Sequence, residues 1–249
     1  MDLNADVGES FGRWELGDDE HLTQHISSAN LACGFHAGDF KVMELSVALC
    51  RRHNVAVGAH PGYPDLIGFG RRPISFIPSE IESLVRYQIG ALWGFCRAAG
   101  IEMRHVKPHG ALYNQAATDP KLAAAMARAI SRFSTDLLMF GLASSDAMKE
   151  AALAENLRFV PEAFADRRYL ADGSLQPRSE QGSLITDPDA AAAQALSIAT
   201  HGTVTTVDGS IVNLPADSIC CHGDTPGAPR IAAAVRQALA GAGISVETP

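Results

Sequence analysis

Short apolar segments alternate with longer amphipathic segments along the whole chain, and this order limits the possible folds more than any other feature. The segments predicted to form strands are residues 2–7, 29–34, 55–60, 103–108, 137–142, 157–164 and 218–223. Helical patterns lie between them, for example from residue 39, over residues 78–100 and from residue 119. Because a helix must carry the chain back across the sheet before the next strand begins, this alternation predicts a parallel sheet in an α/β protein.

The boundaries between these segments carry the signals of helix ends and tight turns. Asp119 stands where a helix N-cap belongs, and Pro120 occupies the first helical position. Residues 204–214 form a predicted hairpin that turns at Asp208 and Gly209. The 249 residues contain no low-complexity linker and no break in composition, so we expect one domain over residues 1–249 with this hairpin inserted.

Charged residues and histidines lie at or just beyond the carboxyl end of almost every predicted strand. They are Asp6, Glu9, His36, Asp39, His60, Asp65, Lys107, His109, Glu162, Asp166, His222 and Asp224. In a closed barrel all these ends meet on one face, whereas in an open doubly wound sheet only the strands near the switch point would contribute. The distribution therefore predicts a seven-stranded parallel (β/α) barrel with its site on that face.

The composition narrows the classes of partner and compartment. A net charge of −8 gives the surface little attraction for nucleic acid or for an anionic membrane. No apolar stretch is long enough to span a membrane, and the N-terminus lacks the basic and apolar regions of a signal peptide. The 5 cysteines are scattered and form no Cys-x-x-Cys pair, as expected for reduced and mostly buried thiols. We therefore expect a cytoplasmic protein.

Two glycine-rich segments place candidate catalytic groups after the first and second predicted strands. In LNADVGESFG, Asp6 and Glu9 could divide the roles of base and orienting group if their surroundings push their pKa values apart. In ACGFHAGD, His36 is a candidate acid, base or metal ligand, whereas Cys33 is more typical of a packed small residue. The alternative is that Asp6 caps a turn and that Glu9 is solvated.

The segment GAHPGYPDLIGFGRR, residues 58–72, is the most specific in the chain. A long loop rich in glycine and proline is typical of a binding loop. His60 is a candidate binding residue within it, and the guanidinium groups of Arg71 and Arg72 suit a phosphate or a carboxylate. The loop is not a Walker loop, since G-x-x-x-x-G-K-[ST] occurs nowhere in the sequence. The alternative is an arginine pair that is solvated or paired with surface acids.

In the segment HVKPHGALYN, Lys107 lies within an apolar strand, where an unpaired ammonium would be costly. We therefore expect Lys107 to meet a carboxylate, a phosphate or a ligand oxygen, which makes it the strongest single candidate for a catalytic residue. His109 follows at the rim of the predicted face and is a second catalytic candidate. His105 is expected to point away from Lys107 and to be structural.

Two segments nearer the end of the chain complete the set of candidates. PEAFADRRY supplies Glu162, Asp166, Arg167 and Tyr169, which we expect to bind substrate or phosphate. CCHGD supplies His222 as an acid or base, with Asp224 as a binding or orienting carboxylate. The histidines at positions 21, 25, 53 and 201 lie in helical or turn segments and are expected to lie outside the site.

Taken together, these segments resemble the signature segments of the lactam-utilisation protein family, which includes the A subunit of 5-oxoprolinase. The resemblance rests on DLNADVGESFG, ANLACGFHAGD, GAHPGYPDLIGFGRR, VKPHGALYN, FADRRY and HGDTPGA, and it spans residues 2 to about 228. It implies a barrel similar to that of glycoside hydrolases and polysaccharide deacetylases. The sequence departs from the family pattern at Phe40, where the family usually has proline, and around Arg178.

The same resemblance implies ATP-dependent hydrolysis of 5-oxo-L-proline to L-glutamate, shared with two partner subunits, B and C. ATP would bind with Mg²⁺ as its counter-ion, and a homo-oligomer is also compatible with the sequence. Opening an unstrained lactam needs activation, which phosphorylation of the lactam oxygen would provide. The residues could then supply cations for phosphate (Lys107, Arg71, Arg72), a base for water (Asp6 or His109) and an acid for the ring nitrogen (His36 or His222).

The sequence leaves three alternatives open. A metal-dependent amide or sugar deacetylase would use Asp6, His36 and His60 around a divalent metal. A glycosidase would depend on a pair of carboxylates such as Asp6 and Glu162. A non-catalytic subunit would bind the lactam and regulate a partner enzyme.

Overall fold

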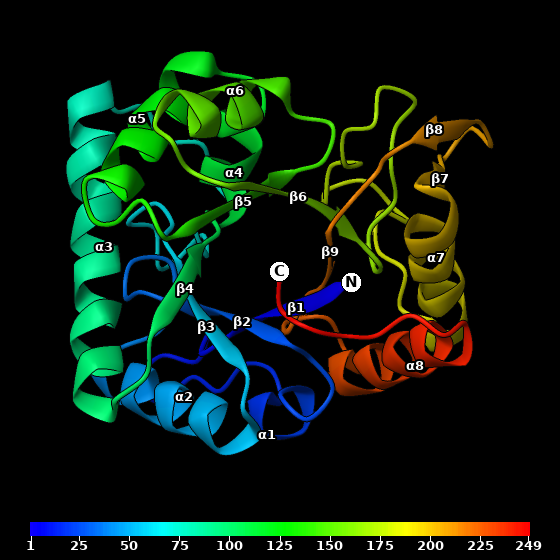
Figure 1. Ribbon diagram of the computed structural model, residues 1–249, viewed down its shortest axis with the longest axis horizontal. Helices are drawn as coiled ribbons and strands as arrows, with labels where there is room; N and C mark the ends of the chain where they lie inside the picture. Colours follow the sequence, from blue (N-terminus) through cyan, green and yellow to red (C-terminus); the bar gives the residue numbers. More distant parts are fainter.

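The computed structural model describes residues 1–249, and seven parallel strands close into a barrel (Figure 1). The barrel strands are β1 (Asp2–Val7), β2 (Ser28–Ala32), β3 (Ala56–His60), β4 (Met103–Val106), β5 (Leu138–Leu142), β6 (Phe159–Phe164) and β9 (Ser218–Cys221). The barrel closes because β1 pairs in parallel with both β2 and β9. The predicted seven-stranded parallel barrel is therefore confirmed.

Every predicted strand is present, and three of them, β2, β4 and β9, end two residues earlier than expected. β4 ends at Val106 and β9 ends at Cys221, so Lys107 and His222 are the first residues after their strands. The backbone N–H of Lys107 still donates to the carbonyl of Ala59 (2.9 Å), but the next residue is a proline without an N–H to continue the ladder. Both side chains are thereby placed at the carboxyl end of the barrel.

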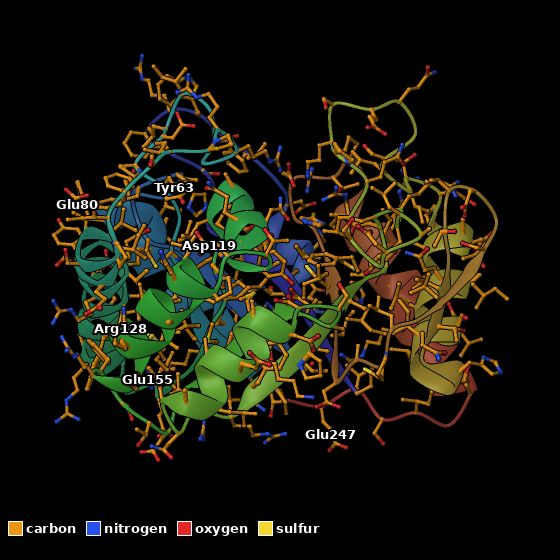
Figure 2. The ribbon with its side chains drawn as sticks, turned by 90° about the horizontal axis from the view of Figure 1, so that it is seen from above. Tyr63, Glu80, Asp119, Arg128, Glu155 and Glu247 are labelled. Atoms are coloured by element: carbon orange, nitrogen blue, oxygen red, sulfur yellow. The ribbon has the colours of Figure 1, made fainter.

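Helices lie around the outside of the barrel. They are α1 (Asp19–Leu22), α2 (Phe40–His53), α3 (Pro78–Ala99), α4 (Gly110–Ala116), α5 (Pro120–Ser131), α6 (Asp146–Ala154), α7 (Pro188–His201) and α8 (Ala228–Gly241). Asp119 caps α5 as predicted, and its carboxylate accepts two backbone N–H groups of the first turn. Helices α3 and α5 lie side by side, where Arg128 of α5 donates to Glu82 of α3 at 2.7 Å (Figure 2).

The two faces of the barrel strands differ in polarity, and β1 shows the difference most clearly. Leu3, Ala5 and Val7 belong to a hydrophobic core of 57 buried residues. Asn4 and Asp6 alternate with them and bond to side chains of other strands inside the barrel. Because successive side chains of a strand point to opposite faces, the outer face packs against helices while the inner face holds a polar network.

Strands β7 (Thr203–Thr205) and β8 (Ile211–Asn213) form a separate antiparallel hairpin between α7 and β9. The hairpin turns at Asp208 and Gly209, and Gly209 has a φ of 85°, in the left-handed region that favours glycine. The five cysteines are all buried and form no disulfide. None of the helices combines the length and the apolar character needed to cross a lipid bilayer.

Candidate active site

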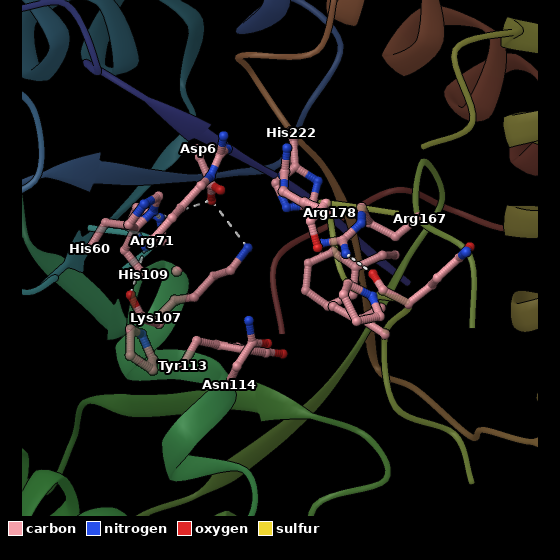
Figure 3. A pocket seen from close by; sticks show the side chains of 18 residues that line it. Asp6, His60, Arg71, Lys107, His109, Tyr113, Asn114, Arg167, Arg178 and His222 are labelled. Atoms are coloured by element: carbon pink, nitrogen blue, oxygen red, sulfur yellow. Dashed lines mark hydrogen bonds and ion pairs between the residues drawn. The ribbon is translucent and has the colours of Figure 1, made fainter. Parts of the chain in front are cut away.

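A cavity of about 390 Å³ opens at the carboxyl end of the barrel strands (Figure 3). Its polar and charged lining comprises Asp6, His60, Arg71, Lys107, His109, Tyr113, Asn114, Arg167, Gln176, Arg178, Ser179 and His222. These side chains lie at the end of, or in the segments after, β1, β3, β4, β6 and β9, so the closure of the barrel brings them together from across the sequence. Figure 3 shows Asp6, His60, His109 and Lys107 on one side of the cavity, and Arg167 and Arg178 on the other.

Lys107 lies at the centre of a buried charge network. Its Nζ donates to Asn4 Oδ1 (3.2 Å), Asp6 Oδ1 (3.1 Å) and Cys220 Sγ (3.0 Å), and it pairs with Glu162 Oε1 at 2.9 Å. Burial favours the neutral amine, but the carboxylates of Asp6 and Glu162 hold the pKa of Lys107 well above its usual range. The expected anionic partners of this ammonium are thus two carboxylates of the protein.

Glu162 acts as an internal counter-ion and lies outside the cavity lining. It is fully buried, and its two oxygens accept hydrogen bonds from Asn4 Nδ2 (2.8 Å) and Tyr113 Oη (2.9 Å). All of its close partners are therefore protein groups, and it contributes no surface for substrate. A glycosidase would need Asp6 and Glu162 to flank a bound sugar, which this position of Glu162 does not provide.

Asp6 and Glu9 have environments that push their pKa values in opposite directions. Although burial favours the protonated acid, His60 and Lys107 hold the pKa of Asp6 well below its usual range. Burial, together with the neighbouring Asp6 carboxylate, raises the pKa of Glu9 well above its usual range. Asp6 lines the cavity as a carboxylate, and Asn30 Nδ2 donates to it at 2.9 Å, whereas Glu9 lies behind the wall.

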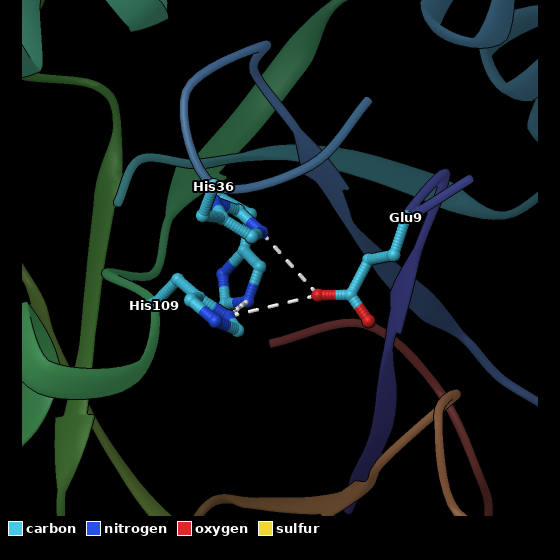
Figure 4. A group of neighbouring side chains, drawn as sticks. Glu9, His36 and His109 are labelled. Carbon is cyan, nitrogen blue, oxygen red and sulfur yellow. Dashed lines mark hydrogen bonds and ion pairs between the residues drawn. The ribbon is translucent and has the colours of Figure 1, made fainter. Parts of the chain in front are cut away.

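Two clusters of side chains have ligand atoms close enough together to hold a metal ion. Glu9, His36, His60 and His109 form the first cluster, in which the ligand atoms lie within 4.8 Å of one another (Figure 4). Asp6, Cys220 and His222 form the second. The set proposed from the sequence, Asp6 with His36 and His60, corresponds to neither cluster. Asp6 lies 3.4 Å from His60 and also bonds to Lys107 and Asn30, but Glu9 is the carboxylate that approaches His36.

His222 is held by a carboxylate that is distant in the sequence. Its Nδ1 lies 2.8 Å from Asp166 Oδ1, and its backbone N–H donates to Asp166 Oδ2 at 2.9 Å. Burial favours the neutral acid, but His222 and these hydrogen bonds hold the pKa of Asp166 at about 2. Because the carboxylate accepts the Nδ1 proton, His222 presents Nε2 as its free ring nitrogen at the cavity. Asp166 thus orients this histidine, and Asp224 does not.

Of the two adjacent arginines predicted to bind anions, only Arg71 reaches the cavity. Arg71 lines the cavity and pairs with Asp224 at 2.6 Å, and Arg178 approaches the same carboxylate at 3.6 Å. Arg72 points to Asp65, with which it forms a bidentate ion pair, and its side chain is 65% exposed. Arg72 therefore lies outside the cavity, because Asp65 already satisfies its guanidinium.

Tyr169, predicted to bind substrate or phosphate, supports the fold and does not line the cavity. It is fully buried, and its hydroxyl accepts the backbone N–H of Phe164 at 2.7 Å. Arg167, two positions earlier, lines the cavity. In this segment Tyr169 therefore supports the end of β6, while Arg167 forms part of the cavity wall.

The expectation that His105 points away from Lys107 is wrong. His105 Nε2 lies 2.8 Å from Asn30 Oδ1, and Asn30 bonds to Asp6 inside the barrel. Residues two apart in a strand share a face, so Lys107 and His105 both point inwards. His105 is nevertheless structural, because it is buried below the cavity and is absent from its lining.

Four residues of the site were not among the candidates predicted from the sequence, namely Asn4, Asn30, Tyr113 and Arg178. Asn4 and Asn30 interrupt apolar strands, and Asn4 shares a face with Asp6, so polar residues within apolar strands were the available signal. Tyr113 and Arg178 had no comparable signal, because a helix and a long loop bring them to the cavity. The four histidines at positions 21, 25, 53 and 201 line no part of it, as expected.

The pH dependence of stability offers a test of the buried state of His105. Burial, with Lys107 and His60 nearby, lowers the pKa of His105 to about 3. The unfolded chain therefore binds one more proton at this residue between about pH 3 and pH 6.5, so stability is lost as the pH falls through that range. We expect wild type to lose about 2 kcal/mol more than His105→Gln between pH 7 and pH 5. Chemical denaturation at several pH values measures the difference, and equal losses would contradict a neutral, buried His105.

Comparison with known proteins places the chain in a family. The LamB/YcsF family matches residues 1–249. A protein from Chloroflexus aggregans, named as the A subunit of 5-oxoprolinase, is 55% identical over 249 residues, which cover 100% of this chain and 98% of that protein. A protein of the same name from Symbiobacterium thermophilum is 51% identical, with coverage of 100% and 95%. The crystal structure of a lactam utilization protein from Thermus thermophilus is 48% identical, with a TM-score of 0.93 and coverage of 99% and 98%. The resemblance seen in the sequence is thus confirmed, and the chain belongs to the LamB/YcsF family.

Proposed function

We propose that this chain binds 5-oxo-L-proline in the cavity and contributes to its ATP-dependent hydrolysis to L-glutamate, together with two partner subunits, B and C. The relatives named as the A subunit of 5-oxoprolinase support the substrate and the existence of other subunits. The unpaired thiols are consistent with action in the cytoplasm. The observation that carries the proposal is a buried arginine on the cavity wall that lacks a carboxylate partner.

That arginine is Arg167. It is 5% exposed, its Nη2 donates to the carbonyl of Gln176 at 2.6 Å, and its Nε is buried without a hydrogen-bond partner. Burial, with Arg178 nearby, lowers its pKa to about 10, so the guanidinium remains charged at neutral pH. A buried cation without an anion is costly, and a ligand carboxylate would remove that cost with a charge-assisted hydrogen bond. The α-carboxylate of 5-oxoproline fits this requirement.

A substrate bound by its carboxylate at Arg167 would extend its lactam ring towards the opposite wall. Transfer of the γ-phosphoryl group of ATP to the lactam oxygen forms an O–P bond and breaks the bond to ADP. Water then adds to the former carbonyl carbon, and the C–N bond breaks as the ring nitrogen takes a proton. A second water releases phosphate, so that the products are glutamate, ADP and phosphate. Arg71 is the cation on this wall that suits the phosphoryl group, whereas Arg72 points elsewhere.

His222 is the residue best placed for the proton transfers. Its Nδ1–H is held by Asp166, so Nε2 can accept a proton from the attacking water and return it to the ring nitrogen. Asp6, with a pKa well below its usual range, is a weak base, and its fixed negative charge would stabilise the protonated His222. His36 lies outside the cavity lining and is a less suitable acid.

The proposal is tested by reconstituting the chain with its two partner subunits. We expect 5-oxoproline-dependent ATP hydrolysis and glutamate release from the three subunits together, and little or none from the isolated chain, which has no Walker loop. Vigorous ATP-dependent glutamate release by the isolated chain would overturn the need for partners. A reconstituted complex without glutamate release would overturn the function.

A neighbouring pair of arginines supplies matched variants for the carboxylate site. Arg167→Gln should raise the KM of the complex for 5-oxoproline by about 10-fold or more, since a charged hydrogen bond to the substrate is lost. Arg168→Gln, at an exposed position, should leave the KM unchanged. The same KM for both variants would show that Arg167 does not bind the carboxylate. Turnover that survives Asp6→Asn and His222→Gln would instead favour a non-catalytic chain that only binds the lactam.

A further inference from the structure

We propose that Glu9, His36, His60 and His109 form a binding site for one divalent transition-metal ion, with zinc as the best-matched ion. The four residues converge at the edge of the cavity from the end of β3 and from the segments after β1, β2 and β4. Figure 4 shows Glu9, His36 and His109 pointing towards one another. The inference concerns metal binding by these side chains and is independent of the reaction proposed above.

The outer nitrogens of two of the histidines are fixed by backbone carbonyls. His60 Nδ1 lies 2.7 Å from the carbonyl oxygen of Lys107, and His109 Nε2 lies 2.8 Å from that of Phe69. A carbonyl oxygen only accepts hydrogen bonds, so each of these nitrogens carries its proton. The inner nitrogens, His60 Nε2 and His109 Nδ1, then carry lone pairs in the neutral rings. Metal-binding histidines in proteins are held in this way, with the second ring nitrogen donating to a carbonyl or a carboxylate.

The two inner nitrogens face each other at 3.0 Å. Two lone pairs at this distance repel each other unless a proton or a cation lies between them. Asp6 Oδ1 also lies 3.4 Å from His60 Nε2, so a negative charge faces the same space. A metal ion would satisfy both lone pairs without protonating either imidazole.

Glu9 supplies the negative charge that such an ion needs. Its Oε1 lies 3.3 Å from His36 Nε2 and 3.6 Å from His109 Nδ1, and its side chain is 4% exposed. It forms no ion pair with a lysine or an arginine, so its contacts within the protein are with imidazoles. A buried carboxylate without a cationic partner is costly, and a bound cation would remove that cost.

Packing against His109 fixes the orientation of the His36 ring. Its ring stacks on the ring of His109 with centroids 3.7 Å apart and an interplanar angle of 4°, and its Nδ1 is buried without a partner. Gly62 and Gly70 permit this arrangement, since a Cβ at Gly62 would lie 2.7 Å from His36 Nδ1 and a Cβ at Gly70 would lie 2.7 Å from His36 Cβ. The histidine rings therefore fit only because positions 62 and 70 carry no side chain.

Three of the ligand-atom separations are close to those expected around one ion, and all of the ligand atoms lie within 4.8 Å of one another. Metal–ligand bonds of about 2.1 Å place neighbouring ligand atoms about 3.0 Å apart at 90° and about 3.4 Å apart at the tetrahedral angle. The separations of 3.0, 3.3 and 3.6 Å in this cluster fall around these values. Three imidazoles and one carboxylate favour zinc or a similar transition metal over magnesium and calcium, which prefer oxygen ligands. His60 and His109 also line the cavity, so the ion would lie at its edge.

Metal binding by the purified full chain, freed of metal with a chelator, tests the proposal. We expect one equivalent of Zn²⁺ in calorimetric titration, and Co²⁺ should give the visible absorption bands of a protein-bound ion with nitrogen ligands. Glu9→Gln and His36→Gln should each weaken binding by at least about 10-fold. The matched surface variants Glu150→Gln and His201→Gln should bind as wild type does. Absence of stoichiometric binding, or equal affinity in all four variants, would overturn the site.

A measurement on the wild-type chain avoids dependence on the folding of the variants. Addition of Zn²⁺ should shift the ring-nitrogen resonances of His36, His60 and His109, and should leave those of His105 and His201 in place. Shifts confined to His222 would assign the ion to the cluster with Asp6 and Cys220 and would overturn the proposal. Both readouts are independent of turnover, so they stand whether or not the chain hydrolyses 5-oxoproline.

Discussion

Lys107→Met is expected to lower the free energy of unfolding by about 3–5 kcal/mol, because it leaves two buried carboxylates without their shared cation. Asp6 and Glu162 both lie within ion-pair distance of Lys107 Nζ, and none of the three side chains is more than 5% exposed. For a chain of this size the loss corresponds to a decrease in Tm of roughly 6–20 °C. Thermal unfolding followed by circular dichroism measures it.

A double variant tests the cause of this loss. Glu162→Gln removes one of the two charges, so Lys107→Met combined with Glu162→Gln should be more stable than the sum of the single effects predicts. Glu162 is suitable for this purpose because it lies outside the cavity lining. Additive effects, or an unchanged Tm in Lys107→Met, would show that the ion pairs contribute little to stability.

Lys107→Met should also reduce turnover of the reconstituted complex by at least roughly 100-fold, measured well below the Tm of the variant. The ammonium is occupied by protein partners, so we expect it to act mainly by holding Asp6 ionised and in place at the cavity. Full activity in the folded fraction would show that Lys107 only supports the fold.

His222→Gln is expected to reduce turnover of the complex by about 10²- to 10⁴-fold with little change in stability, because the amide cannot carry a proton between water and the ring nitrogen. The glutamine can still donate a hydrogen bond to Asp166, which limits the structural cost. Steady-state rates of glutamate release, together with Tm, measure the two effects. His201→Gln, at an exposed position of α7, is the matched control and should retain full turnover.

Asp166→Asn separates orientation from proton transfer in the same pair. The amide would no longer favour the tautomer with its proton on Nδ1, so we expect a loss of turnover and a changed pH profile although His222 is still present. Wild-type turnover and an unchanged pH profile in Asp166→Asn would show that Asp166 has no influence on His222. Wild-type turnover in His222→Gln would show that His222 takes no part in the proton transfers.

Much of the fold follows from local features of the sequence. The alternation of short apolar strands with amphipathic helices requires crossover connections and therefore a parallel sheet. Polar residues after nearly every strand favoured closure, because a barrel gathers all strand ends on one face. Caps such as Asp119 and the turn at Gly209 depend on a few neighbouring residues, so they too could be placed in advance.

The pairing of side chains was decided by the tertiary structure. Lys107 meets Asp6 across 101 positions of the sequence, and Asp166 meets His222 across 56. His222 has Asp224 two positions away, yet that carboxylate turns to Arg71. Sequence spacing cannot distinguish these partners, since the curvature and closure of the barrel determine which strand ends face each other.

The chemistry of single residue types could therefore be predicted, while their roles could not. A lysine within an apolar strand must have an anionic partner whatever the fold, and this requirement is set by the cost of burying a charge. Whether the partner is a substrate or a pair of protein carboxylates depends on which strands are neighbours. In the same way the arginines 71 and 72 are adjacent in the chain, but the loop directs Arg71 into the cavity and Arg72 onto Asp65. The sequence by itself determined the barrel and the face that carries its polar residues, and the packing of distant segments decided which of those residues can meet a ligand.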